Sequence, residues 1–312
     1  MSMPISKVVV VTRETELDEL VRRFNTKAQA KFYLQQGGHS FADIQRTHDS
    51  YQRVVGSVID SIPREQKIQR IDRALIPRFT FGSDELVITI GQDGLVSNTA
   101  KYLSGQPIFA VNPAPERFDG VLLPFDPDNF SAPLHAALHG EMNKRPVTLA
   151  RAHASDGQEL LAFNDFFIGA KSHVSARYEI RIADRTELHS SSGVIVSTGA
   201  GSTGWLQSVY AGAAGVVATF GGKFIPPPDQ GRLPWDTDQL IYSVREPFPS
   251  QTTQCSLVHG RLSRASPLTL SSRMPSNGVI FSDGIESDYL AFNSGQTLTI
   301  EPAARQSILL TH

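Results

Sequence analysis

A strand, a glycine turn, a helix and a second strand follow one another near residue 90, and this pattern constrains the fold most. Leu86–Ile90 is a short apolar run, and Gly91-Gln92-Asp93-Gly94 follows it directly. Leu95–Leu103 then predicts a helix, and Ile108–Val111 predicts a further strand. Two strands connected through a helix run parallel, so the first part of the chain is expected to contain a parallel sheet.

The rest of the first 124 residues fits an α/β domain. Val8–Thr12 is a β-branched run typical of a buried strand. Apolar residues recur with helical spacing over residues 17–24 and again over residues 54–62, where Pro63 ends the pattern. The basic segment Arg64–Arg78 is interpreted as a solvated helix face rather than a binding patch. We therefore expect residues 1–124 to form an α/β domain with a parallel, Rossmann-like sheet.

The pattern changes after Pro124. A polar, proline-containing segment suggests a linker or crossover, and Ser208–Phe220 predicts a packed helix of small apolar residues. Short β-like runs separated by turn residues predict a β-rich second domain over residues 125–290, with residues 291–312 as a tail that can return to the first domain. The runs are Val147–Arg151, Glu159–Phe163, Arg177–Ile182, Gly193–Thr198, Gln239–Val244, Thr269–Leu270, Gly278–Phe281 and Thr297–Ile300.

Composition narrows the class of protein. The chain has 29 lysines and arginines against 31 aspartates and glutamates, a balance that argues against a protein built to coat nucleic acid or an anionic membrane. Cys255 is the one cysteine, so an internal disulfide framework and a cysteine-rich zinc site are excluded. Val8–Val11 is too short for a signal peptide or a membrane span. We expect a soluble, cytoplasmic protein.

Two glycine-rich turns are candidate ligand sites. Gly91-Gln92-Asp93-Gly94 lies at the carboxyl end of a predicted strand, where open α/β sheets bind ligands and where a helix N-terminus favours an anion. A carboxylate such as Asp93 beside a phosphate can hold a metal, orient a hydroxyl or take its proton; the alternative is a plain Asp-Gly turn. Gly199–Trp205 offers backbone amides and hydroxyls to a ribose or phosphate, or is a structural turn. Trp205 either stacks on a base or packs in the core.

Two dipeptides that each contain one aspartate are weaker candidates for ligand sites. Asn164-Asp165 ends a predicted strand and can recognise an amide, an adenine edge or ribose hydroxyls, although an ordinary Asx turn explains it equally simply. Asp283-Gly284 is interpreted as a hairpin turn.

Together these segments have the order and spacing of the NAD kinase family, which the chain resembles over nearly its whole length. Ile88–Leu95 resembles that family's strand followed by GGDGT, and Phe163-Asn164-Asp165, Val194–Trp205 and Ser282-Asp283-Gly284 resemble its later motifs. The resemblance is closest to the mitochondrial type and its bacterial relatives. It rests there on Lys7–Arg13, Val111–Arg117, Ser192–Trp205 and Ser243–Pro247.

The resemblance implies a specific activity. Family members transfer the γ-phosphate of ATP, which carries Mg²⁺, to the 2′-hydroxyl of the adenosine ribose of NAD, making NADP. It implies a nucleotide-binding first domain, a dinucleotide-binding second domain, a site between them and a dimer or tetramer. Asp93 is the implied base, with Gly91 and Gly94 on the phosphate path and no protein metal site. The implied NAD-binding residues are Asn112, Asn164, Asp165, Gly201, Ser202 and Thr203.

Two other functions stay open. Gln92 and Leu95 replace the second glycine and the threonine of the family motif. They suggest, as one alternative, a dinucleotide-binding protein that has lost the chemistry. The other alternative is a kinase of the wider superfamily, which includes diacylglycerol and sphingosine kinases, acting on another hydroxyl.

Overall fold

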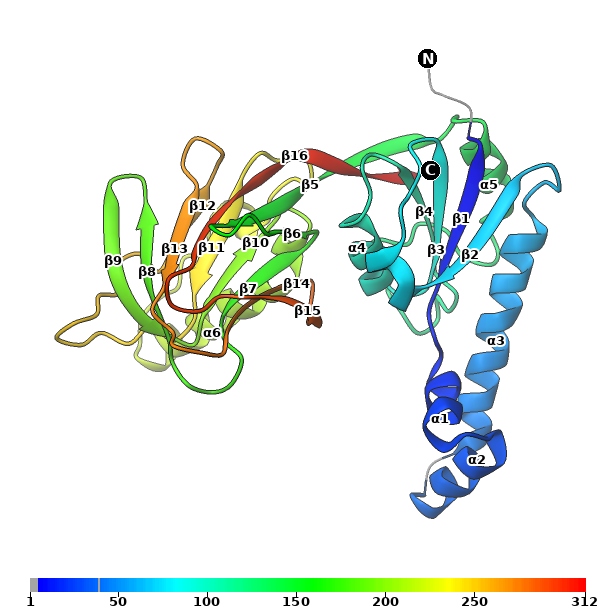
Figure 1. Ribbon diagram of the computed structural model, residues 1–312, viewed down its shortest axis with the longest axis horizontal. Helices are drawn as coiled ribbons and strands as arrows, with labels where there is room; N and C mark the ends of the chain where they lie inside the picture. The colour runs from blue at the N-terminus through cyan, green and yellow to red at the C-terminus, as the bar shows by residue number, and fades with distance from the viewer. Residues whose placement is uncertain (1–4, 39) are drawn as a thin grey trace. The chain divides into compact units, whose positions relative to one another are not determined.

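The computed structural model describes residues 5–38 and 40–312, and the chain divides into two units (Figure 1). The first unit runs to Arg145 and includes the last residues, Ile308–His312, and the second is Pro146–Ser307. Two long strands, β5 (Asn143–Ala154) and β16 (Thr297–Thr311), each have residues in both units. Residue 124, where we expected the first domain to end, lies inside the first unit.

A parallel sheet forms the centre of the first unit, as predicted. Its strand order is β2-β1-β3-β4, followed by the end of β16, and every neighbouring pair is parallel. The strands are β1 (Lys7–Thr12), β2 (Lys67–Asp72), β3 (Glu85–Ile90) and β4 (Pro107–Val111). All residues of β3 are buried, because this central strand is paired on both edges and covered on both faces.

Helices cover this sheet. The longest, α3, packs Tyr51, Val54 and Val58 into the same core as the side chains of β1 and β3. The α-helices are α1 (Glu16–Phe24), α2 (Lys27–Gln36), α3 (Phe41–Asp60), α4 (Asp93–Ala100) and α5 (Ser131–Leu138). None of the helices within the described ranges is both long and apolar enough to cross a membrane.

Two interpretations of the first unit were wrong. The segment Arg64–Arg78 is not a helix face: β2 occupies its centre and the 3-10 helix Arg73–Arg78 ends it. As an edge strand, β2 is mostly exposed, and pairing with β1 overrides its weak sequence pattern. The segment after Pro124 is not only a linker, because Leu134, Ala137 and Leu138 of α5 pack into the core.

The second unit is β-rich, as predicted. One antiparallel sheet has the order β12-β11-β10-β7-β14-β15, and the strands β16, β13, β8 and β9 pair antiparallel in a second group, with β5 paired to β6. A single apolar core joins both groups. The strands are β6 (Glu159–Ala162), β7 (Asp165–Ala170), β8 (Ala176–Ile182), β9 (Arg185–Ser191), β10 (Val194–Ser197), β11 (Leu240–Val244), β12 (His259–Leu262), β13 (Leu268–Ser272), β14 (Gly278–Ser282) and β15 (Ile285–Ala291).

The helix expected over Ser208–Phe220 forms as α6 (Trp205–Thr219), but it is not packed as predicted. Only Leu206 and Tyr210 are buried, and Val216 is 61% exposed. Alanine and glycine make the segment apolar without giving it large side chains to bury, so hydropathy overstated its packing.

Candidate functional site

The Gly91-Gln92-Asp93-Gly94 turn joins β3 to α4 at the carboxyl edge of the parallel sheet. Gly91 N donates to the Val111 carbonyl at the end of β4, 3.1 Å away. A Cβ on Gly91 would lie 2.9 Å from Leu95 Cδ2, so this glycine lets the turn close against α4. Leu95 is 2% exposed, so its side chain is packed inside the fold.

Gln92 fits this turn without strain. It caps α4 with an extended backbone, φ −95° and ψ 169°, which any L-residue adopts. A Cβ on Gly94 would meet nothing within 4 Å, and Gly94 is exposed. A side chain at 91 would have to displace the end of the Leu95 side chain, whereas the space beside Gly94 is open.

Asp93 lies in the first turn of α4. Its Oδ1 accepts a hydrogen bond from Leu122 N at 2.7 Å, while Oδ2 accepts none from the residues described. One oxygen is thus held in place and the other can accept a hydrogen bond from a hydroxyl.

Asn112 lies close by but is fully engaged with its own loop. Its side-chain Nδ2 donates to the Phe118 carbonyl at 2.9 Å, and its Oδ1 accepts from Ala114 N at 3.1 Å. The residue is 3% exposed. Its geometry is that of a residue that shapes the loop after β4, and its contact with NAD stays a prediction.

In the second unit, the Asp283-Gly284 turn is more than a hairpin turn. The Asp283 carboxylate accepts hydrogen bonds from three successive backbone amides, those of Phe163 (3.0 Å), Asn164 (2.6 Å) and Asp165 (3.3 Å). Asp283 has φ +53°, a left-handed conformation that aspartate tolerates better than most residues. The turn therefore fixes the Asn164-Asp165 segment at the start of β7.

Asp165 has an unusual protonation equilibrium. Burial first, and then the nearby charge of Asp283, raise the pKa of Asp165 to about 7. Near neutral pH, Asp165 is consequently neutral in some molecules and ionised in the others. The neutral form can donate a hydrogen bond, whereas the ionised form only accepts.

The Gly199–Trp205 loop packs directly on this segment. A Cβ on Gly201 would lie 2.0 Å from the Asn164 carbonyl oxygen, so glycine is required there. The Ser202 hydroxyl donates to the Gly199 carbonyl at 2.6 Å and accepts from Leu233 N at 3.0 Å. Thr203, in contrast, is exposed. The structure thus brings Asn164, Asp165, Gly201 and Asp283 together, with Ser202 holding the loop.

An aromatic cavity beside this loop was missed in the sequence. Trp205 stacks on Phe167 at 6.0 Å between ring centroids with 14° between planes, and the Arg245 guanidinium lies 5.6 Å from the Trp205 ring centroid. Phe281 and Tyr289 also line this cavity of about 340 Å³. The Ser243–Pro247 motif contained a signal for Arg245, whereas nothing singled out Phe167.

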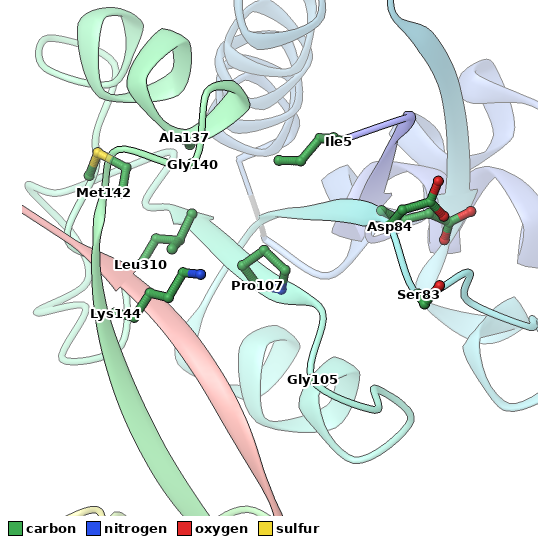
Figure 2. Close-up of a pocket in the computed structure, with 11 residues that line it drawn as sticks. Ile5, Ser83, Asp84, Gly105, Pro107, Ala137, Gly140, Met142, Lys144 and Leu310 are labelled. Carbon is green, nitrogen blue, oxygen red and sulfur yellow. The ribbon is translucent and has the colours of Figure 1, made fainter. Parts of the chain in front are cut away.

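A different cavity lies at the opposite edge of the parallel sheet (Figure 2). Asp84 and Pro107, at the amino ends of β3 and β4, line about 170 Å³ together with Leu310 and Lys144. Figure 2 shows Lys144 on one side and Asp84 on the other. No predicted site residue lines this cavity. Among the residues described, no group of three or more His, Cys, Asp or Glu side chains is arranged to hold a metal ion.

Comparisons with known proteins identify the fold. No protein-family model matches the sequence, and no curated protein sequence matches it. An NAD kinase from Archaeoglobus fulgidus, in complex with ATP, is similar in structure with a TM-score of 0.55 and 16% identity, over 97% of this chain and 93% of that chain. Yeast NADH kinase complexed with NADH is similar with a TM-score of 0.58 and 15% identity, over 99% of this chain and 84% of that chain. The chain has the two-domain fold of the NAD kinases, which confirms the predicted fold class.

Proposed function

We propose that this protein is an NAD kinase, which transfers the γ-phosphate of ATP to the 2′-hydroxyl of the adenosine ribose of NAD. One observation carries the proposal: in a chain with the NAD kinase fold, Asp93 follows the central parallel strand, with one carboxylate oxygen held by Leu122 N and the other accepting no hydrogen bond from the described residues. The archaeal relative is bound to ATP and the yeast relative to NADH, which supports the same two classes of substrate here.

In the proposed reaction, Asp93 accepts a hydrogen bond from the 2′-hydroxyl and takes its proton as the oxygen–phosphorus bond forms. The bond between the γ-phosphorus and the β–γ bridging oxygen breaks, and ADP leaves. Gly91, Gly94 and the amides at the start of α4 line the phosphate path, where a helix N-terminus favours negative charge. Mg²⁺ enters with ATP as part of the substrate and neutralises phosphate charge.

The second unit is proposed to bind the dinucleotide. Asn164 and Asp165 present polar groups to the adenosine, and the exposed hydroxyl of Thr203 lies on the adjoining loop. Gly201 and Ser202 act by keeping that loop against Asn164. The motifs Val111–Arg117 and Ser243–Pro247 support assignment to the mitochondrial type of the family. The resemblance of the chain to the NAD kinases also supports a dimer or tetramer.

The test compares two isosteric variants located beyond the two ends of β3. Asp93→Asn should lower NADP formation from ATP and NAD by about 10²–10⁴-fold, because the base is lost, with NAD binding by calorimetry unchanged within a few fold. Asp84→Asn is the matched control: it lies just before β3, at the opposite end of that strand, and should keep full activity. Unchanged turnover in Asp93→Asn contradicts the assignment of the base.

The same assay separates the alternatives. It is run with NAD, NADH and a lipid as acceptors and with ATP and polyphosphate as donors. NAD binding without any NADP formation indicates a dinucleotide-binding protein, and phosphorylation of a lipid acceptor instead indicates the wider superfamily. Either result overturns the proposed function.

A further inference from the structure

We propose that a cavity of the first unit lined by Arg13, Arg46, Arg53 and Arg117 binds a chain of phosphate groups. The ligand class is a nucleoside triphosphate or an inorganic polyphosphate. Its assignment to the phosphoryl donor rests on the proposed function, whereas the cavity as a polyphosphate site does not.

The cavity lies next to the Gly91–Gly94 turn. It encloses about 570 Å³ between the residue after β1, one face of α3 and the loop after β4. Arg13 Cδ is 3.6 Å from the position that a Cβ on Gly91 would take. The Tyr51 hydroxyl, which also lines the cavity, donates to the Ile90 carbonyl at 2.9 Å, at the last residue of β3.

The charge of the lining favours an anion. Four arginines and two carboxylates, those of Asp49 and Glu116, line the cavity. When Asp43, the ion-pair partner of Arg46, is also counted, a formal excess of one positive charge remains. Arg117 Nη1 donates to the neutral Thr47 hydroxyl at 2.8 Å, and Arg53 Nε is 3.4 Å from the Asp49 backbone carbonyl. Arg46 pairs with Asp43. The planar guanidinium group suits phosphate oxygens because it can donate two parallel hydrogen bonds.

Arg13 carries the clearest sign of a missing partner. Its Nε is buried and has no hydrogen-bond partner among the residues described. A buried polar group without a partner costs free energy that a ligand oxygen in the cavity would recover. The guanidinium lies 5.8 Å from the Tyr51 ring centroid, and burial raises the pKa of Tyr51, so that phenol stays neutral and does not balance the charge of Arg13.

Asn112 shapes the third wall. By bonding to Phe118 and Ala114 it fixes the loop that carries Glu116 and Arg117. The Val111–Arg117 motif therefore has a role other than contact with NAD, because it positions Arg117 beside the phosphate chain.

The experiment measures binding of sodium tripolyphosphate, ATP and NAD by calorimetry. Arg13→Ala and Arg117→Ala should each weaken tripolyphosphate binding about tenfold or more, since a hydrogen bond to a charged group is lost. Lys144→Ala is the control, because this cation lines the cavity at the other edge of the sheet, and it should change affinity less than twofold. Arg117 lies on a loop, so its variant keeps the test valid if Arg13→Ala fails to fold.

The outcomes separate this inference from the proposed function. Equal weakening of ATP and tripolyphosphate, with NAD binding unchanged, supports the site with the nucleotide as its ligand. Weakening of tripolyphosphate alone supports it with inorganic polyphosphate as the ligand. The inference is overturned if the wild-type protein does not bind tripolyphosphate, or if both arginine variants bind it as the wild type does. Loss of binding in these variants would stand even if the protein made no NADP.

Discussion

The buried carboxyl group of Asp165 makes the stability of the second unit depend on pH. Its pKa is about 7 in the folded protein, against an ordinary value of 3.8 for an exposed aspartate. Between these two values the folded protein holds a proton that the unfolded chain releases, so the free energy of unfolding falls as pH rises from about 4 to about 7. A difference of about three pKa units corresponds to roughly 4 kcal/mol of unfolding free energy. Below pH 4 both states are protonated and the full stability is present.

The variant Asp165→Asn tests this reasoning, because asparagine has the same shape and does not ionise. Urea unfolding is measured from pH 4 to 8 by tryptophan fluorescence, which reports the second unit alone since Trp205 and Trp235 both lie there. We expect the wild type to lose about 4 kcal/mol relative to the variant over this range. Burial also lowers the pKa of His259, but that contribution is common to both proteins and cancels in the difference. Parallel pH profiles of the two proteins would refute the argument.

Two further substitutions probe how the second unit holds its site. Asp283→Ala removes an acceptor shared by three amides and should lower the unfolding free energy, measured in urea, by about 2–5 kcal/mol. The control Asp184→Ala, at the exposed β8–β9 turn, should change it by less than about 0.5 kcal/mol. Equal effects of the two substitutions would show that the amides find other partners. Gly201→Ala places a methyl group against the Asn164 carbonyl and should cost about 3 kcal/mol or more, while Gly212→Ala, in open space on α6, should gain up to about 1 kcal/mol. A neutral Gly201→Ala would contradict the close approach of the two segments.

The framework of the fold was predictable because its strongest signals are local. Apolar runs and turn residues predicted a strand, a glycine turn and a helix near residue 90. The structure forms them as β3, the Gly91–Gly94 turn and α4. β2 was missed since an edge strand buries little and has no clear period. β7 was also missed, although it is central, because Asn164-Asp165 was interpreted as the end of the preceding strand, whereas a new strand begins at Asp165.

For the candidate site, the sequence identified positions better than it identified their local contacts. Asp283 was interpreted as a turn residue, and no spacing rule could show that its carboxylate caps amides about 120 residues earlier. The arginines of the phosphate cavity come from three separate segments of the chain. Their convergence depends on tertiary structure, which the sequence pattern does not contain.

The contacts also explain which departures from a family motif the fold can accept. Glycine is sterically required at 201, where a Cβ would strike the Asn164 carbonyl, whereas a Cβ at 91 would meet the end of the Leu95 side chain. Glycine is not required at 92, where Gln92 has an ordinary extended backbone. Leu95 is buried and packs against Gly91, so the aliphatic side chain is integrated into the turn. The backbone of the turn is therefore built with glutamine and leucine in place.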